Sequence, residues 1–374
     1  MTHPSPEIRV ETDPPSSVRI LAGGLADELA ARCAPPRSID YVVADAHVLS
    51  LHASALGPLA RVPRTVIAPG EASKSMAGLE ALLSDFAAAG LDRHSRILAF
   101  GGGVTSDLAG LAAALFMRGI AYVTAPTTLL AQVDASVGGK TAVNLPAGKN
   151  LVGAFHQPEK VLIDTRLLAT LLTAEWRSGW GEVLKAALLG ARLPDGTLLF
   201  ELLESRPASD FAAREAASEL TARDPELLSQ IVHACVAHKA AIVTADFTER
   251  GPREQLNLGH TFAHAIEHVA SFGRVPHGVA VATGLALALD LAAREGRLED
   301  HSLPTRTANL ARKLGLPASL ADLEAELGHA FDPDALEAAM RRDKKARDGT
   351  PRCILPIALG RWCATEVEGP LLLR

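Results

Sequence analysis

Several histidines and acidic residues are spaced so that they can gather on one side of a helix. Asn257, His260, His264 and Glu267 recur at intervals of three and four residues, the spacing at which helical side chains share a face. Two histidines four residues apart can reach one metal ion, and His277 follows a few residues later. Because the donors are imidazole and carboxylate without cysteine, the pattern predicts a catalytic zinc site with an open coordination position.

Charged side chains also interrupt two apolar helical patterns. Glu182 and Lys185, three residues apart in an otherwise apolar segment, suit a surface ion pair or a metal ligand beside a substrate-binding ammonium. Lys239 falls on the apolar stripe of a predicted helix that begins at Asp224 with Pro225 in the first helical position. An inward lysine needs a partner or an anionic ligand, because an unpaired buried charge is costly; alternatively, it extends its ammonium to solvent.

Glycines cluster where a backbone could approach a phosphate. Gly101, Gly102 and Gly103 follow one predicted strand and precede a helix, whose N-terminal N–H groups attract anions. The run does not have the GxGxxG spacing and would also suit a structural turn. Two further predicted strands end in similar turns, at residues 126–128 and 70–75. Three such turns at one sheet edge favour a nucleotide site.

A second glycine cluster carries lysines. The runs Gly-Gly-Lys140-Thr and Gly-Lys149-Asn150 place two ammonium groups and an amide beside flexible backbone, which suits a phosphate or carboxylate ligand. Asp134 stands where a Walker loop would require glycine, so the sequence argues against nucleotide hydrolysis.

The elements that would hold these groups change in character along the chain. The 374 residues are enough for two domains. From about 17 to 170, short β-branched runs alternate with alanine- and leucine-rich helical stretches, which predicts a Rossmann-like parallel sheet. The predicted strands are Tyr41–Ala44, Arg64–Ile67, Arg96–Phe100 and Ala121–Thr124, and the predicted helices are Ser75–Gly90 and Asp107–Phe116. From about 174, helical periodicity dominates, apart from a short strand at Arg352–Ile357. We therefore predict an α/β plus α protein, with a Rossmann-like domain at 1–172 and a mainly helical domain at 173–374.

Composition excludes several classes of protein. The chain is 48% hydrophobic, so it can bury a large core and is not mostly disordered. The 37 basic residues against 43 acidic ones give a net charge of −6, which provides no global basic field for nucleic acid. Aromatic residues make up only 4%, too few for a base-stacking surface.

The sequence also predicts a cytoplasmic protein without a membrane partner. Its first residues, 1–6, lack the basic and apolar regions of a signal peptide. The most apolar stretch, Gly278–Ala293, contains Asp290 and is too short to span a bilayer, so it is predicted to be a buried helix. The four cysteines, which lack CxxC spacing and fit a reducing compartment, are Cys33, Cys235, Cys353 and Cys363.

Taken together, these segments resemble the 3-dehydroquinate synthase family of sugar phosphate cyclases. The resemblance runs in the family's order from about Gly70 to Gly360 and is most specific over 126–141. The other matching stretches are 70–75, 101–110, 117–119, 148–150, 182–185, 256–267, 277–278 and 343–345.

The resemblance implies a specific reaction and two bound groups. The expected enzyme is a lyase of the shikimate pathway, which supplies aromatic amino acids. It would cyclise 3-deoxy-D-arabino-heptulosonate 7-phosphate to 3-dehydroquinate and release phosphate. The implied steps are transient oxidation at C5 by NAD, elimination, re-reduction and aldol closure. The resemblance also implies one divalent metal, zinc or cobalt, and a homodimer.

It further implies a role for individual residues. The implied metal ligands are Glu182, His260 and His277, so His264 moves to substrate contact and proton handling. The implied catalytic residues are Asp134, Lys140, Lys185, Lys239, Glu249 and His264. The implied substrate-binding residues are Arg118, Lys149, Asn150, Arg253, Asn257 and one of Lys344 or Lys345, with Arg118 reaching the phosphate across the dimer interface. The implied NAD-binding residues are Asp45, Glu71, Lys74, Gly102, Gly103, Asp107, Thr127, Thr128, Lys140 and Lys149.

Departures from the family pattern keep alternatives open. The changed positions are His47, Ser106, Ala142, His156, Phe247, Ala263 and Val279. Glu249, Arg253 and Asn257 are retained, which indicates a substrate with a carboxylate. An aminodehydroquinate synthase, or another cyclase of a specialised pathway, would fit the same residues. A metal- and NAD-dependent alcohol dehydrogenase would instead release NADH and would not need the lysine cluster. The retained metal ligands argue against an inactive homologue.

Overall fold

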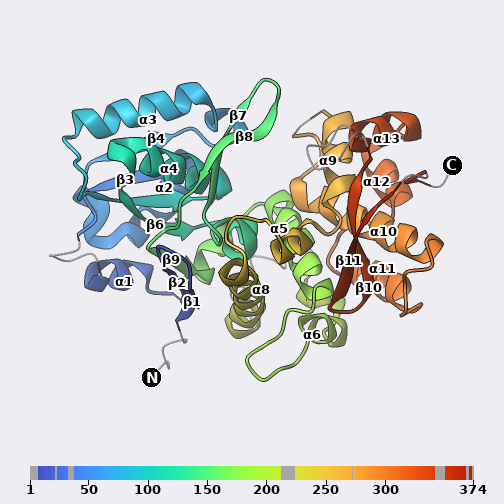
Figure 1. The fold of residues 1–374 in the computed structure, drawn as a ribbon. Helices are drawn as coiled ribbons and strands as arrows, with labels where there is room; N and C mark the ends of the chain where they lie inside the picture. The colour runs from blue at the N-terminus through green and yellow to red at the C-terminus, as the bar shows by residue number, and fades with distance from the viewer. Residues whose placement is uncertain are drawn as a thin grey trace. The chain divides into compact units, whose positions relative to one another are not determined.

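The structure is a computed structural model, drawn in Figure 1, and describes residues 7–21, 23–32, 38–211, 224–271, 273–341, 350–367 and 370–372. Its contacts divide the chain into two units. The sheet unit comprises Met1–Leu171 and Thr221–Thr248, and the helical unit comprises Leu172–Leu220 and Glu249–Arg374. The first crossing between them, after Leu171, lies one residue before the predicted boundary at 172/173.

Seven strands form the main sheet of the sheet unit, in the order β1-β2-β9-β6-β5-β3-β4. Only the edge pair β1–β2 is antiparallel. The strands are β1 (Ile8–Val10), β2 (Ser16–Leu21), β3 (Tyr41–Asp45), β4 (Arg64–Ile67), β5 (Arg96–Gly101), β6 (Ala121–Pro126) and β9 (Lys160–Asp164). The four predicted strands and the Rossmann-like parallel sheet are confirmed. The sequence analysis missed β1, β2 and β9, which extend the sheet on one side.

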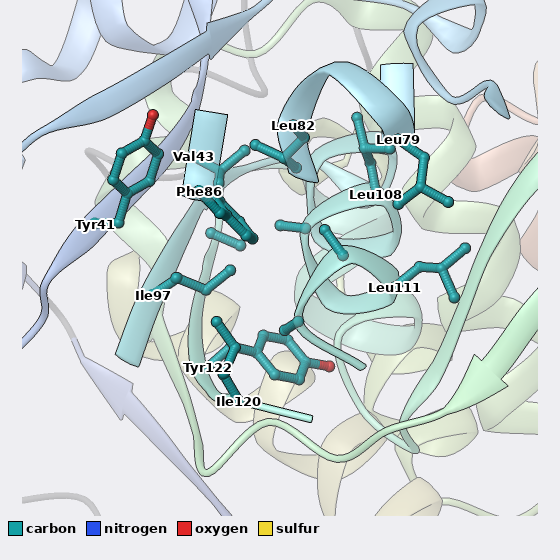
Figure 2. Close-up of a cluster of buried hydrophobic side chains, with 14 of the residues drawn as sticks. Tyr41, Val43, Leu79, Leu82, Phe86, Ile97, Leu108, Leu111, Ile120 and Tyr122 are labelled. Carbon is teal, nitrogen blue, oxygen red and sulfur yellow. The ribbon is translucent and has the colours of Figure 1, made fainter. Parts of the chain in front are cut away.

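Helices cover both faces of this sheet, as the alternation of side chains requires. Val43 and Ile97 point into one core with α3 and α4, which Figure 2 shows in close-up. Their neighbours Val42 and Leu98 point into the core on the opposite face, because successive strand residues alternate sides. The helices are α1 (Leu25–Arg32), α2 (Ala46–His52), α3 (Met76–Ala88), α4 (Gly103–Leu115) and α8 (Pro225–Ala245).

Short turns and a hairpin complete the sheet unit. The helical turns are η1 (Ala53–Arg61), η2 (Glu71–Ser73), η3 (Phe116–Arg118), η4 (Ala131–Ala135) and η5 (Thr165–Thr170). The antiparallel hairpin of β7 (Lys140–Leu145) and β8 (Gly148–Phe155) packs on α4 and was not predicted. It carries both lysines of the second glycine cluster.

Helix α8 departs from the predicted domain organisation. Asp224 accepts a hydrogen bond from Leu227 N and Pro225 opens the helix, as predicted. However, α8 packs against β1, β2 and η4 of the sheet unit, whereas the sequence analysis placed it in the helical domain. Its apolar stripe, which includes Leu228 and Ile231, is buried in these contacts. Helical periodicity identifies such a stripe but does not say which domain covers it.

The helical unit holds most of the remaining described helices and a second two-stranded hairpin. Its helices are α5 (Thr173–Leu188), α6 (Leu199–Ser205), α9 (His260–Val269), α10 (His277–Arg294), α11 (Leu303–Lys313), α12 (Leu320–Leu327) and α13 (Pro333–Arg341). Two short turns, η6 (Ala208–Asp210) and η7 (Pro252–Asn257), join them. The strand predicted at Arg352–Ile357 is confirmed as β10 (Arg352–Ala358), which pairs with β11 (Arg361–Glu366).

Two helices are long and apolar enough to cross a membrane by length and composition. They are α8 and α10, and about two thirds of each apolar window is buried inside the protein. The sequence analysis judged the α10 segment too short, which its 18 residues contradict. Its prediction of a buried helix is confirmed, because 67% of the apolar window of α10 is buried inside the protein.

Candidate functional site

One carboxylate and two imidazoles of the helical unit come together. Glu182 lies in α5, while His260 and His277 are the first residues of α9 and α10. Glu182 Oε1 is 3.6 Å from His260 Nε2 and 3.3 Å from His277 Nε2. The side chain of Glu182 is 1% exposed, against 13% for His260 and 32% for His277. The carboxylate of the cluster is therefore buried in the core, while its two histidines are partly exposed to solvent.

A close crossing of two helices sets the separation of Glu182 and His277. A Cβ atom on Gly278 would lie 1.8 Å from Ser178 O, and one on Gly181 would lie 2.0 Å from Gly278 O. Such contacts are impossible, so α5 and α10 can approach this closely only with glycine at both positions. Gly181 immediately precedes Glu182, and Gly278 immediately follows His277. The crossing thereby holds Glu182 and His277 side by side.

A second glycine pair brings α9 against α10. A Cβ atom on Gly284 would lie 2.2 Å from Gly259 O. Gly259 has a φ of +77° and immediately precedes His260. Its left-handed backbone separates η7 from α9 and lets the chain turn into the helix. For this reason Asn257 does not continue the α9 face, which corrects the single helical stripe that the spacing suggested.

Lys185 accompanies Glu182 in the buried part of the cluster. Lys185 Nζ lies 2.5 Å from Glu182 Oε2, and the two side chains are 4% and 1% exposed. This burial rules out the alternative of a surface ion pair. The ammonium stabilises the ionised form of the carboxylate, which is the form that binds a metal.

Each histidine turns its two ring nitrogens toward different partners. His260 Nδ1 lies 3.2 Å from Leu258 O, and His277 Nδ1 lies 3.5 Å from a carboxylate oxygen of Glu267. Burial alone would lower the pKa of His277, but the carboxylates of Glu182 and Glu267 outweigh it and raise that pKa to about 10. A metal ion would therefore displace a proton from this ring.

Four further predicted residues of the helical unit lie in α9, in η7 or shortly before η7. The ring of half-buried His264 is 5.5 Å from that of His260, one helical turn away. Asn257 Nδ2 donates to Glu249 Oε1 at 2.8 Å, and Glu249 has a φ of +57°. The guanidinium-bearing Arg253 is only 1% exposed. Lys344 and Lys345 lie outside the described residues.

In the sheet unit, two neighbouring strands end beside each other at the glycine turn. Gly101 of β5 is in register with Pro126 of β6, and Thr127 N donates to Gly101 O at 3.0 Å. Gly102 then caps α4, and Gly103 begins it. A Cβ atom on Gly102 would lie 2.9 Å from Thr128 Cγ2. The predicted strand–turn–helix geometry is present, with a turn that has no room for a side chain.

A polar network lies beside this turn and joins η2, α4 and the β7–β8 hairpin. Lys74 Nζ pairs with Asp107 of α4 and donates to Asn150 Oδ1 at 2.5 Å. Asn144 Nδ2 donates to Glu71 Oε1 at 2.8 Å, and Asn144 Oδ1 accepts from Asn150 N at 2.9 Å. The network thus brings together three predicted cofactor residues and one predicted substrate residue.

Asp45 has a structural role in the sheet unit. Its Oδ1 accepts from His47 N and Val48 N at 2.8 and 3.1 Å, so it caps α2 at the end of β3. This fixes the carboxylate at the same carboxyl-terminal sheet edge as the glycine turn, because β3 and β5 are parallel neighbours.

Asp134 and Lys239 form a half-buried ion pair. Lys239 Nζ lies 2.9 Å from Asp134 Oδ1 and donates to Asp134 O at 2.6 Å. The lysine on the apolar stripe of α8 thus has the partner that its burial requires. Asp134 lies in η4, a π-helical turn, a conformation often found at functional sites. Lys140 and Arg118 are exposed, at the start of β7 and the end of η3, whereas Lys149 in β8 is half-buried.

The donor set of the helical unit fits a divalent metal. Glu182, His260 and His277 each offer one ligand atom, and these atoms lie within 4.8 Å of one another. One carboxylate and two imidazoles form a typical catalytic zinc set that leaves a position open for substrate. The second nitrogen of each imidazole faces an acceptor, as expected around a metal site.

The glycine turn fits a dinucleotide. Thr127 Oγ1 is buried and has no hydrogen-bond partner among the described residues. It lies just after the carboxyl end of β6, next to the turn where Gly102 packs closely against Thr128. An unpaired buried hydroxyl is rare in folded proteins unless a ligand or water completes it. The N-terminus of α4 adds free N–H groups for phosphate.

Sequence reasoning missed the contacts that two residues of these clusters make. Glu267 was placed on the α9 face but was not paired with His277, because the two are on separate helices. Asn144 bridges Glu71 and Asn150 across the hairpin, which the sequence analysis did not predict. In both cases the contact joins separate elements, and the only signal was a polar residue close in sequence to other candidate site residues.

Comparison with known families gives matches over most of the chain. A family model described as 3-dehydroquinate synthase N-terminal matches residues 64–178, and one described as 3-dehydroquinate synthase C-terminal matches residues 179–346. The 3-dehydroquinate synthase of Paracoccus denitrificans (strain Pd 1222) is 42% identical over 364 residues, covering 96% of this chain and 94% of that protein.

Solved structures of sugar phosphate cyclases share the fold. A 2-deoxy-scyllo-inosose synthase complexed with carbaglucose-6-phosphate, NAD⁺ and Co²⁺ has a TM-score of 0.79 at 26% identity, covering 97% of this chain and 96% of that one. The 2-epi-5-epi-valiolone synthase of Streptomyces hygroscopicus subsp. jinggangensis 5008, with NAD⁺ and Zn²⁺ bound, has a TM-score of 0.77 at 30% identity, covering 95% and 92%. An iron-containing alcohol dehydrogenase from Thermotoga maritima shares the fold alone, at 16% identity and a TM-score of 0.57.

Proposed function

This chain belongs to the 3-dehydroquinate synthase family, and we propose that the residues described above perform that family's reaction. The enzyme is a lyase that cyclises 3-deoxy-D-arabino-heptulosonate 7-phosphate to 3-dehydroquinate and releases phosphate. Substrate and products balance without a net oxidant, so the enzyme consumes no NAD. The main support for this activity is the 42% sequence identity to a 3-dehydroquinate synthase over 96% of this chain.

The metal would be held by Glu182, His260 and His277. When bound, a zinc or cobalt ion polarises a substrate oxygen, and NAD supplies transient oxidation and re-reduction. Lys185 holds the Glu182 carboxylate through their 2.5 Å contact and offers its ammonium to the substrate. His264, one helical turn beyond His260, would handle protons of a bound hydroxyl.

The remaining polar residues would bind the two anionic ends of the substrate. In the helical unit, Arg253 and Asn257 serve the carboxylate, with Glu249 holding Asn257 by its hydrogen bond. In the sheet unit, Lys140, Lys149, Asn150 and Lys239 serve the phosphate and neighbouring oxygens, and Asp134 positions Lys239. The roles of Lys344 and Lys345 as further cations rest on the family resemblance.

NAD would bind at the carboxyl-terminal edge of the parallel sheet. The N–H groups of the glycine turn and of the start of α4 bind the pyrophosphate, with Gly102 and Gly103 in that turn. Thr127 and Thr128 supply hydroxyls. Lys74 joins Asp107 and Asn150 at the same edge, which gives the cofactor residues and the substrate residues one shared network. Asp45 and Glu71 complete the proposed cofactor set.

The proposal also includes an oligomeric state and a cellular location. We infer a homodimer whose contact face includes Leu115 and Met117, because both are more than half exposed beside Arg118. A cytoplasmic location fits the thiol form of the described cysteines Cys235, Cys353 and Cys363, since disulfides are rare in reducing compartments.

The test is phosphate release by the protein loaded with zinc and NAD⁺. Three substrates are supplied in parallel: 3-deoxy-D-arabino-heptulosonate 7-phosphate, its 4-amino analogue and sedoheptulose 7-phosphate, with each carbocycle identified by mass. We expect turnover of the first without accumulation of NADH, and its loss in Lys140→Ala and His260→Ala. Preference for the amino analogue would instead indicate an aminodehydroquinate synthase, which the relatives do not favour. A lack of phosphate release from all three substrates would contradict the cyclase activity.

A further inference from the structure

Glu267 is a buried carboxylate with no role in the mechanism above. It lies in α9, two turns after His260, and its side chain is 6% exposed. Its Oε1 lies 3.5 Å from His277 Nδ1, across the gap between α9 and α10. Burying a carboxylate is costly unless a charged or hydrogen-bonding partner compensates for it. One such partner is the ring of His277, a proposed metal ligand.

The contact settles which nitrogen of His277 faces the metal cluster. Nε2 of the same ring lies 3.3 Å from Glu182 Oε1, so the imidazole stands between two carboxylates. A neutral imidazole has one N–H donor and one lone pair. If Nδ1 carries the hydrogen toward Glu267, the Nε2 lone pair is directed at the cluster, where a metal needs it.

His260 provides an internal comparison. Its Nδ1 faces the backbone oxygen of Leu258 at 3.2 Å, and its Nε2 also turns toward Glu182. Both rings therefore use the same orientation, with Nδ1 on an acceptor and Nε2 in the cluster. The difference is that His260 is oriented by a backbone carbonyl, whereas His277 depends on a side chain that can be replaced.

Glu267 also changes the charge available to a dication. Lys185 lies 2.5 Å from Glu182, so that pair is close to neutral as a unit. Glu267 adds a negative charge on the far side of His277 without occupying a coordination position. A nearby anion strengthens cation binding most where burial lowers the effective dielectric constant.

From these contacts we propose that Glu267 is the positioning residue of the metal site: it accepts a hydrogen bond from His277 Nδ1–H, fixes the ring orientation and increases metal affinity. The inference rests on the proposed metal centre. It extends that centre to a residue that touches neither substrate nor metal.

The experiment measures zinc affinity by competition with a chromogenic chelator in wild type, Glu267→Gln, His277→Ala and Glu204→Gln. Glu204 of α6 is the matched control, since its ion pair with Arg306 lies in the same unit away from the cluster. We expect Glu267→Gln to bind zinc about 10- to 100-fold more weakly, and Glu204→Gln to bind as wild type. The cobalt-loaded Glu267→Gln protein should also show a shifted ligand-field spectrum, which a merely structural residue would not cause.

The outcomes separate this inference from the metal assignment. If His277→Ala binds zinc as tightly as wild type, the proposed centre itself is wrong. If His277→Ala loses zinc but Glu267→Gln retains wild-type affinity, only the role of Glu267 is overturned. Should Glu267→Gln fail to fold, ¹⁵N-histidine NMR of zinc-loaded wild type decides the matter. A His277 ring protonated on Nδ1 supports the proposal, and one protonated on Nε2 contradicts it.

Discussion

At the scale of single residues, His277 links metal binding to pH. The carboxylates around it raise its pKa to about 10 against the burial that would lower it. A raised pKa means that the protonated ring stabilises the metal-free fold, fully below about pH 6.5 and progressively less as the pH rises toward 10. A metal must remove that proton.

We therefore expect zinc affinity to rise with pH by about tenfold per unit between pH 7 and 9, because one proton is displaced. Calorimetry in buffers of different ionisation enthalpy measures the protons released on binding. Wild type should release about one more proton than His277→Ala. Equal release by the two proteins would contradict the assignment of the proton to His277.

Lys185 gives a second prediction at this scale. Lys185→Met leaves Glu182 buried without its ammonium partner, which should lower the free energy of unfolding of the metal-free protein by about 3–5 kcal/mol. Zinc should restore much of this loss, because the ion replaces the missing positive charge. Denaturant titration with and without zinc measures both effects. An unchanged metal-free stability would show that the pair contributes little to the fold.

At the scale of elements, the helix crossings position the cluster. Gly278→Ala would place a methyl group 1.8 Å from Ser178 O, so α5 and α10 must separate. We expect a loss of stability of about 1–3 kcal/mol or more, together with weaker zinc binding. Ala280→Gly, in the same helix, is the control: it should cost about 1 kcal/mol of helix propensity and leave zinc affinity unchanged. Thermal unfolding and chelator competition measure the two quantities.

The glycine turn makes the corresponding prediction for NAD. Gly102→Ala would press a methyl group to 2.9 Å from Thr128 Cγ2. We expect NAD affinity to fall about tenfold or more, since such overpacking costs about 1–3 kcal/mol, while zinc affinity stays the same. Adding Thr128→Ser removes Cγ2 and keeps the hydroxyl, so the double variant should regain affinity. Failure of this rescue in a NAD⁺ titration would show that the clash is not the cause.

The same scale explains what the sequence could predict. Local patterns specify β3, β5 and β6, because each is a short buried run of apolar residues. β5 and β6 also end at Gly101 and Pro126, whereas β3 ends at Asp45, the cap of α2. They also specify the cap of α8, where Asp224 and Pro225 act within one helical turn. The hairpin β7–β8 and the contact of Glu267 with His277 depend on residues from separate elements. The period of a single helix or strand does not reveal such contacts. The spacing of Asn257 suggested that it continues the α9 face, but Gly259, in the left-handed region, separates Asn257 from that helix.

At the scale of the whole molecule, the exposed residues at the end of α4 and in η3 predict self-association. Leu115 and Met117 are 51% and 54% exposed, and Met117 and Arg118 have φ values of +50° and +70°. Large apolar side chains held outward by unusual backbone suit a contact between copies. Met117→Asp should shift the protein from dimer to monomer in light scattering, whereas Leu51→Asp, at a similarly exposed apolar position in α2, should not. A dimer that survives Met117→Asp would place the contact elsewhere.

Helix α8 belongs to the sheet unit although it follows part of the helical unit in the sequence. This order has a consequence for how the protein folds during synthesis. Residues up to Leu171 contain every described strand of the seven-stranded sheet but lack the helix that packs on β1, β2 and the turn carrying Asp134. During synthesis on the ribosome, these surfaces stay uncovered until α8, which ends at Ala245, has left the exit tunnel. Over that interval the nascent chain exposes apolar surface and leaves Asp134 without Lys239, so a chaperone that recognises such surface would have its best opportunity then.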